Sequence, residues 1–189
     1  MTNDEVRIPG VVFGKLTRHA DARGGFAKAW RARGSAGIEP FPGVQANLSS
    51  SAQGVLRGLH LHQRQSDLWI VVSGVAFVAL VDLRPMLADA SATPVVQTAT
   101  LARDDTVRIP PHVAHGFLAI EPLELLYLVT NEYDASDELG LAWDDPRVGV
   151  PWPRVATEDG RPILSERDQR NPPLAELVAL IVEDRRDQP

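Results

Sequence analysis

The chain has 189 residues, of which 44% are hydrophobic and 23% charged, as is ordinary for one well-buried globular domain. Its net charge of −6 argues against general nucleic-acid binding, and no apolar run reaches the roughly 20 residues that a membrane helix needs. The absence of cysteine excludes disulfides and thiol catalysis. The polar N-terminus does not look like a signal peptide, so we expect a cytoplasmic protein.

Short strands are predicted along most of the chain, because prolines and glycines divide it into short segments. Residues 1–53 hold short apolar runs and one polar stretch at 45–51, and we expect N-terminal strands and loops there. The densest strand signal follows at residues 68–72 and 75–83. A Ser-Gly pair joins these two runs, so they predict a buried hairpin.

Further strands follow this hairpin at close spacing, with no helical stretch between them. They are predicted at residues 95–101, 106–109, 115–120 and 123–130. Such spacing predicts an antiparallel sandwich or barrel.

One amphipathic helix is predicted near the end of the chain. Asn171 can cap this helix, and Pro172 suits its first turn. We expect its apolar stripe to pack against the barrel or against a partner subunit. The residues of this stripe, which recur with helical period, are Leu174, Leu177, Val178, Ile181 and Val182.

Four of the five histidines fall in two short segments, and three of them are candidates for a functional site. In an extended segment His60 and His62 point to the same face, because the side-chain period of a strand is two. Asp67 begins the next predicted strand, and His115 begins a later one. Three imidazoles and a carboxylate can bind Fe, Mn, Ni, Co or Zn. The alternative is that these histidines only hydrogen-bond to the barrel wall.

The intervals between Gly54 and Gly74 resemble the first cupin motif, with Asp67 in place of the usual glutamate. Pro110 and His115 fit the second cupin motif. The resemblance implies an all-β fold, the double-stranded β-helix or jelly-roll barrel, with a few short helices including the C-terminal one.

We expect a single cupin domain over residues 1–189. Residues 1–53 supply N-terminal strands and loops, residues 54–150 the barrel core, and residues 151–189 a C-terminal loop and helix.

A wider resemblance runs from about residue 10 to about residue 175 and rests on ordered blocks of sequence. They include Asp21-Ala-Arg23-Gly-Gly-Phe26, Gln45-Ala-Asn47, Gly54 to His60, and Pro162 to Asp168. In these blocks the chain resembles the dTDP-4-dehydrorhamnose 3,5-epimerase family, a branch of the cupins. The resemblance implies an isomerase of deoxysugar biosynthesis that inverts C3, C5 or both in a nucleoside-diphosphate 4-keto-6-deoxyhexose. The family mechanism requires no cofactor.

The resemblance implies three catalytic residues. His60 is the base that removes the proton beside the C4 ketone, Asp168 orients His60, and Tyr127 returns a proton on the opposite face. These residue types suit the reaction, because inversion beside a ketone needs a base on one face and an acid on the other. The implied substrate-binding residues are Arg23 and Arg57 for the diphosphate, with Phe26, Gln45, Asn47, His115, Tyr133 and Trp143 around the nucleotide and sugar.

Members of this family generally form dimers that share their N-terminal strands. We therefore expect a homodimer in which Arg23 serves the neighbour's pocket. Neither nucleic acid nor a membrane is expected as a partner.

The chain departs from the family at Asp67, where the family has a lysine that stabilises the enolate oxygen. A carboxylate there opposes the reaction, because stabilising the developing charge is often the largest catalytic term. In one alternative, a divalent metal on His62, Asp67 and His115 replaces the lysine. In a second, His60 is also a ligand, which implies a metal-dependent isomerase, lyase or oxygenase. In a third the site is metal-free and Arg64 stabilises the enolate. A sugar-nucleotide-binding protein without catalysis is a further alternative.

Overall fold

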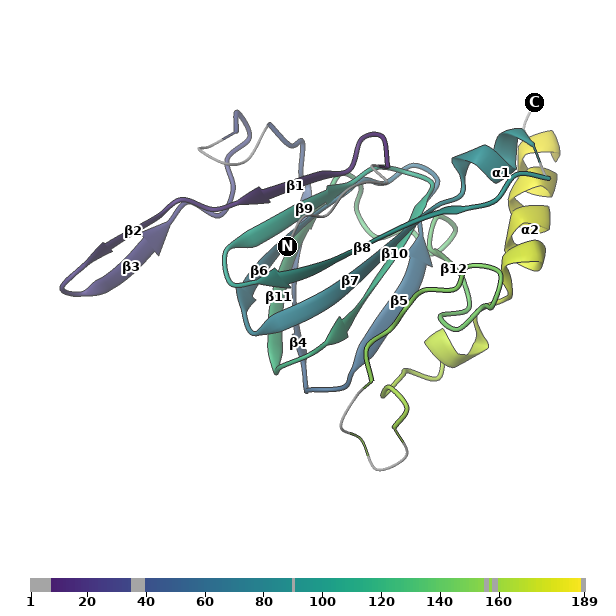
Figure 1. Ribbon diagram of the computed structural model, residues 1–189. Helices are drawn as coiled ribbons and strands as arrows, with labels where there is room; N and C mark the ends of the chain where they lie inside the picture. Colours follow the sequence, from purple (N-terminus) through teal and green to yellow (C-terminus); the bar gives the residue numbers. More distant parts are fainter. Residues whose placement is uncertain (1–7, 35–39, 90, 155–156, 158–159, 188–189) are drawn as a thin grey trace.

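The computed structural model describes residues 8–34, 40–89, 91–154, 157 and 160–187. Two five-stranded antiparallel sheets face each other and form a jelly-roll barrel, which confirms the expected all-β fold (Figure 1). The first sheet has the order β1 (Val12–Lys15), β9 (Asp105–Ile109), β6 (Asp67–Ser73), β11 (Leu123–Val129), β4 (Gln45–Ser51). The second has the order β12 (Leu139–Gly140), β5 (Leu56–Leu61), β10 (Val113–Ala119), β7 (Val75–Asp82), β8 (Val95–Ala102).

The strands predicted from residue 68 onward are present, with small shifts at their ends. The predicted central hairpin is β6 followed by β7, and Gly74 joins them with a φ of +84°, which favours glycine. The polar stretch in the N-terminal part is β4, whose burial alternates along the strand. Gln45, Asn47 and Ser49 lie on its less exposed face, so this strand presents amide and hydroxyl groups to the barrel interior.

Large apolar side chains fill the space between the two sheets. Trp69 and Leu125 of the first sheet pack with Val78, Leu80 and Phe117 of the second. Trp69 and Phe117 also lie against a cavity at this level. The core and the floor of the cavity are therefore the same layer of side chains.

The predicted C-terminal helix is α2 (Leu174–Asp187), and it covers the outer face of the second sheet beside the short helix α1 (Arg84–Ala88) (Figure 1). Its buried positions include Leu177 and Ile181, each 1% exposed. The apolar stripe therefore packs on the barrel, which is one of the two expected outcomes.

The prediction that Asn171 caps this helix is wrong. The backbone N–H of Leu174 donates to Oδ2 of Asp145 at 2.7 Å, so a carboxylate from a distant loop satisfies the first turn in place of Asn171.

A hairpin formed by β2 (Arg18–Asp21) and β3 (Gly24–Ala27) projects from the barrel (Figure 1). At its base, Arg18 makes a two-pronged ion pair with Asp104, with Nε 2.7 Å from Oδ2 and Nη2 2.5 Å from Oδ1. Further out, Phe26 is 63% exposed. An aromatic side chain presented in this way is available to a partner.

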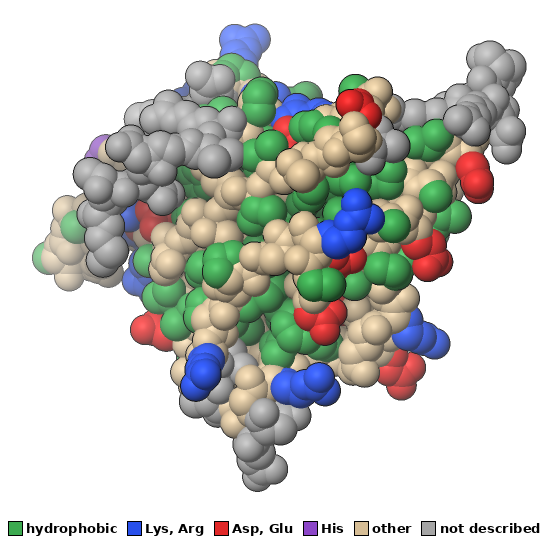
Figure 2. Space-filling view, turned by 45° about the vertical axis from the view of Figure 1, so that its right-hand side comes forward, with side chains coloured by type: hydrophobic (Ala, Val, Ile, Leu, Met, Phe, Trp, Pro, Cys, Tyr) green, Lys and Arg blue, Asp and Glu red, His purple; other side chains and the backbone are tan. Residues whose placement is uncertain are grey.

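No helix in the described ranges is long and apolar enough to cross a membrane. Figure 2 shows Lys and Arg side chains scattered among Asp and Glu on the face it presents, with no basic patch there. This distribution agrees with the net charge of −6 and gives no footprint for nucleic acid on that face.

Candidate active site

A cavity of about 320 Å³ lies between the two sheets. Both sheets and the loops that follow β5 and β11 line it. The structure brings nine of the sequence-predicted site residues to its wall, namely Gln45, Asn47, Arg57, His60, His62, Asp67, His115, Tyr127 and Tyr133.

His60 lies on β5 and is paired with Asp168, which begins a short 3-10 helix. The distance from His60 Nε2 to Asp168 Oδ1 is 2.9 Å. An isolated parallel bridge between Val55 and Ile163 lays the C-terminal segment along the start of β5, and this brings the carboxylate to the imidazole.

Asp168 is buried, and burial alone raises the pKa of a carboxyl group. The hydrogen bond and charge of His60 outweigh this effect, with hydrogen bonds from Ser165 and the Gly58 backbone, so the pKa of Asp168 is lowered. An ionised carboxylate only accepts hydrogen bonds. Nε2 of a neutral His60 therefore carries the proton, and Nδ1 keeps the lone pair that a base needs.

Gly58 allows the close approach of β5 and β10 that sets His60 opposite His115. The pairing of the two strands shifts register beyond His115, and Gly58 has a φ of +116°. A Cβ atom on Gly58 would lie 2.7 Å from Cα of Gly116 and 2.7 Å from the carbonyl oxygen of His115. No side chain fits there, so the geometry of the two histidines depends on glycine at this position.

Tyr127 lies on β11 in the first sheet, on the wall of the cavity opposite the sheet that carries His60. Burial raises the pKa of its phenol, and the Asp67 carboxylate raises it further, while Arg57 lowers it. The phenol therefore keeps its proton at neutral pH and is a proton donor.

His62, Asp67 and His115 form a second group, in which one ligand atom from each lies within 4.8 Å of the others. Nδ1 of His62 is 3.0 Å from the carbonyl oxygen of Asp137, and Nδ1 of His115 is 2.9 Å from that of Val113. Burial, the largest effect, lowers the pKa of His115 to about 4, so this imidazole is neutral at pH 7. These three residues are able to hold a metal ion.

His60, the fourth metal ligand expected from the sequence, is not part of this group. Its Nε2 is engaged by Asp168 instead. The structure thus separates the predicted base from the predicted ligands.

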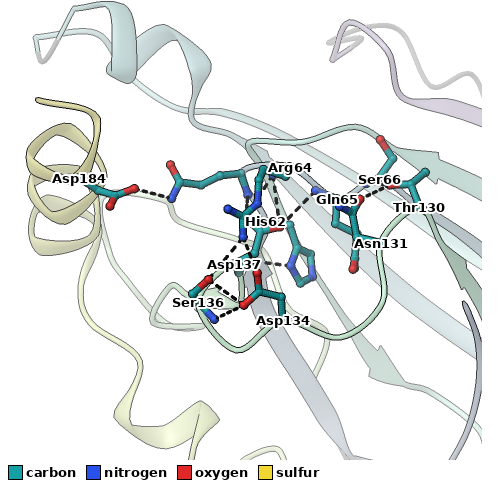
Figure 3. A network of polar contacts seen from close by, with 11 residues as sticks. His62, Arg64, Gln65, Ser66, Thr130, Asn131, Asp134, Ser136, Asp137 and Asp184 are labelled. Carbon is teal, nitrogen blue, oxygen red and sulfur yellow. Dashed lines mark hydrogen bonds and ion pairs between the residues drawn. The ribbon is translucent and has the colours of Figure 1, made fainter. Parts of the chain in front are cut away.

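Asp137 holds the short loop that follows β5 (Figure 3). This residue was missed in the sequence analysis, because no sequence pattern connects Asp137 to a loop more than 70 positions away. Its buried carboxylate accepts backbone N–H groups from Gln63 at 3.0 Å, Arg64 at 3.2 Å and Gln65 at 3.3 Å. Its backbone carbonyl accepts Nδ1 of His62. One residue therefore fixes both the loop and the orientation of an imidazole.

Arg64 lines the cavity, but its guanidinium is already paired with carboxylates (Figure 3). Nη2 lies 2.6 Å from Oδ2 of Asp134, and Nε lies 3.6 Å from Oδ1 of Asp137. This pairing weakens the alternative in which Arg64 supplies the positive charge at the site.

Three expected substrate-binding residues do not reach this chain's cavity, because of where their elements lie. Arg23 and Phe26 are on the projecting hairpin, where the side chain of Arg23 is 90% exposed and pairs with Asp21 at 2.6 Å. Trp143 follows β12, and its carbonyl accepts the indole N–H of Trp152 at 2.8 Å. Arg23 and Phe26 remain candidates for a neighbour's cavity.

The family model described as dTDP-4-dehydrorhamnose 3,5-epimerase matches residues 5–176. The spore coat polysaccharide biosynthesis protein SpsL of Bacillus subtilis (strain 168) is 36% identical over 151 residues, covering 77% of this chain and 96% of SpsL. An epimerase of Mycobacterium tuberculosis has a solved structure that is similar with a TM-score of 0.78 and 32% identity, over 96% of this chain and 92% of that one. ChmJ, a 3'-monoepimerase from Streptomyces bikiniensis, has been solved in complex with dTDP-quinovose. Its structure is similar with a TM-score of 0.77 and 27% identity, over 94% of this chain and 90% of that one.

Proposed function

Because the chain belongs to the dTDP-4-dehydrorhamnose 3,5-epimerase family, we propose that it is an isomerase of nucleoside-diphosphate 4-keto-6-deoxyhexoses, acting at C3, C5 or both. The observation that carries this proposal is the His60–Asp168 pair at one wall of a cavity whose opposite wall holds Tyr127. Because the chain is similar to a 3'-monoepimerase, the proposal includes inversion of a single carbon centre.

The reaction follows from the positions of these groups. His60 removes the proton beside the C4 ketone, and the imidazolium that forms is stabilised by the ionised Asp168. The electron pair of the broken C–H bond passes to the ketone oxygen as an enolate. Tyr127 then gives its proton to the other face of the carbon, and His60 and Tyr127 return to their starting states by exchange with water. Substrate and product are isomers.

Polar groups for the rest of the substrate lie along the cavity wall. Arg57 is held by its Nε to Oγ of Ser51 at 3.0 Å and by Nη2 to the carbonyl oxygen of Ser50 at 3.1 Å. A guanidinium fixed in this way suits a diphosphate. Asn47 and Tyr133, which also line the cavity, then contact the nucleotide or sugar.

A homodimer is part of the same proposal. The projecting hairpin carries Arg23 and Phe26 away from their own barrel, and a second copy of the chain supplies a cavity for them to reach. Leu48 lies on the edge strand β4, and Val44 directly precedes this strand. Their side chains are 65% and 61% exposed and offer apolar surface for the contact between subunits.

The test is to incubate the protein with dTDP-4-keto-6-deoxyglucose in D₂O and to follow deuterium at C3 and C5 by NMR. Exchange at one or both carbons is expected, and the His60→Asn variant serves as the control that lacks the base. Absence of exchange by the wild-type protein, with and without added divalent metal, contradicts the proposal.

His60 lies outside the group formed by His62, Asp67 and His115, and this favours epimerisation over a metal-dependent lyase or oxygenase that uses His60 as a ligand.

A further inference from the structure

We infer that His62, Asp67 and His115 bind one divalent transition-metal ion at the cavity wall, and that this ion stabilises the enolate oxygen of the proposed reaction. Binding of the ion depends only on the three side chains. Its role in stabilising the enolate rests on the proposed function.

The hydrogen bonds around the two imidazoles decide which of their atoms face Asp67. A backbone carbonyl only accepts, so Nδ1 of His62 carries a proton toward Asp137, and Nδ1 of His115 carries one toward Val113. Each neutral ring then has its lone pair on Nε2. The metal-ligating histidines of proteins are commonly oriented by such a second-nitrogen contact to a carbonyl.

Three electron-pair donors therefore converge with no proton left to share between them. Nε2 of His115 lies 3.7 Å from Oδ2 of Asp67, which is too long for a hydrogen bond, and the three ligand atoms lie within 4.8 Å of one another. A lone pair facing a carboxylate at this distance is repulsive. A cation between these atoms turns the repulsion into coordination.

The carboxylate is held in place from outside the group. Oδ1 of Asp67 accepts Nε2 of Gln65 at 2.9 Å, and Oδ2 accepts the indole N–H of Trp69 at 3.1 Å. The Trp69 ring also packs edge-on against His115, with the ring centroids 5.3 Å apart. Asp67 and His115 are each 4% exposed. Preorganised ligands of this kind lower the cost of binding an ion.

Two imidazoles and one carboxylate suit Mn²⁺, Fe²⁺, Co²⁺, Ni²⁺ or Zn²⁺. Three protein ligands leave coordination positions open toward the cavity, where a substrate oxygen can bind. When bound, the ion supplies a Lewis acid for a ketone oxygen. The charge of the group changes from one negative to one net positive, which is the sign that a developing enolate requires.

The two arginines at the cavity wall, among the described residues, have other roles. Arg64 pairs with Asp134 and Asp137, and Arg57 is the residue that the proposed function assigns to the diphosphate. Asp67 without an ion adds a negative charge beside the reacting centre. A metal ion resolves this conflict with residues already in place.

The binding experiment uses the full chain, treated with a chelator and titrated with Co²⁺ without any sugar, by calorimetry and visible absorption. One ion per chain is expected, with Co²⁺ bands typical of nitrogen and oxygen ligands. His62→Gln, Asp67→Asn and His115→Gln are each expected to weaken binding at least about 10-fold. His19→Gln, which changes an exposed histidine on β2, is the matched control and binds as the wild type does.

Failure of the wild type to bind Co²⁺ stoichiometrically overturns the site, and this reading does not depend on any variant folding. Binding that survives unchanged in correctly folded His62→Gln and His115→Gln proteins, as judged by circular dichroism, also overturns it.

The catalytic half is tested by deuterium exchange with metal-free and metal-reloaded protein. Exchange is expected to fall at least about 10-fold without metal and to recover on reloading. Full exchange by the metal-free protein overturns the Lewis-acid role and leaves the epimerase proposal standing. Stoichiometric binding with no exchange in either state supports the metal site and contradicts the proposed function.

Discussion

His60 and Asp168 lie 108 positions apart in the chain, yet Nε2 of the histidine is 2.9 Å from Oδ1 of the carboxylate. The bridge from Val55 to Ile163 brings the C-terminal segment to β5, and Asp168 is then buried beside the imidazole. The contact between the C-terminal segment and the start of β5 therefore brings together the base and the group that orients it.

Replacing Asp168 by asparagine is expected to lower kcat about 100-fold or more with little change in KM, because it disturbs the tautomer and the stabilisation of His60 without touching the substrate. Steady-state kinetics of the wild type and Asp168→Asn check this. Glu121→Gln, which changes an exposed carboxylate in the turn between β10 and β11, is the control and is expected to leave kcat unchanged. A wild-type kcat in Asp168→Asn would remove the orienting role.

The acidity of Asp168 also predicts how stability depends on pH. Its folded-state pKa lies below the ordinary value of 3.8, so its ionised form stabilises the folded protein above that value. This contribution is lost as the pH falls through the lowered pKa. Urea unfolding should show a stability difference between wild type and Asp168→Asn that shrinks as the pH falls below about pH 4. A difference that grows on acidification below about pH 4 contradicts the lowered pKa.

Tyr127→Phe separates proton removal from inversion. His60 still removes the substrate proton in this variant, but no acid on the opposite wall returns one, so deuterium enters from D₂O while the configuration is retained. We expect inversion to fall roughly 100-fold and exchange to fall much less. NMR of the recovered sugar distinguishes the two, and inversion at the wild-type rate would assign the acid to another residue.

Asp137→Asn is expected to destabilise the protein by about 1–3 kcal/mol, because a buried acceptor of three backbone N–H groups is replaced by a weaker, neutral one. Urea unfolding at neutral pH measures this change. Asp144→Asn, at an exposed position, is the matched control and should stay within about 0.5 kcal/mol of the wild type. Equal stability of the two variants would show that the loop does not depend on Asp137.

Subunit complementation tests whether Arg23 serves the neighbouring cavity. Arg23→Ala and His60→Asn are each expected to be poorly active alone. In a hybrid dimer one cavity has an intact His60 and receives an intact Arg23 from the partner. Co-expression in equal amounts makes half of the dimers hybrid with one working site of two, so activity should recover to roughly a quarter of the wild-type value.

No recovery in the mixture would mean that Arg23 acts in its own subunit or not at all. Sedimentation gives an independent check, and a monomer at micromolar concentration contradicts the dimer.

The parts of the fold that the sequence predicts well are those with a strong apolar pattern, either a continuous run or a helical stripe. Strands β6 and β7 are apolar runs closed by a Ser-Gly turn, and α2 carries its stripe at Leu174, Leu177 and Ile181. Strand β4 is harder to predict from the sequence, because the side chains on its inward face are polar and line the cavity. Gln45 and Asn47 occupy positions that would be apolar in a strand facing the core.

Contacts between distant segments are the parts that the sequence does not reveal. The cap of α2 comes from Asp145 and the anchor of the loop after β5 comes from Asp137, and neither pairing has a local signature. The site residues could be identified because they sit in recognisable blocks. Two groupings are among the sequence-based alternatives: Asp168 with His60, and His62 with Asp67 and His115. The sequence leaves open whether His60 joins the second group, and that depends on the folded geometry.

The indole fluorescence of Trp69 can report on the contents of the cavity that this side chain lines. Its indole N–H is bonded to Asp67, and its ring lies edge-on to both His115 and Phe117. Indole fluorescence responds to hydrogen bonding and to nearby charge, so the emission of this one side chain reports what occupies the group beside it. Substitution of the other three tryptophans, Trp30, Trp143 and Trp152, by phenylalanine isolates that emission. Ligand and metal binding then become measurable in real time, without any substrate being turned over.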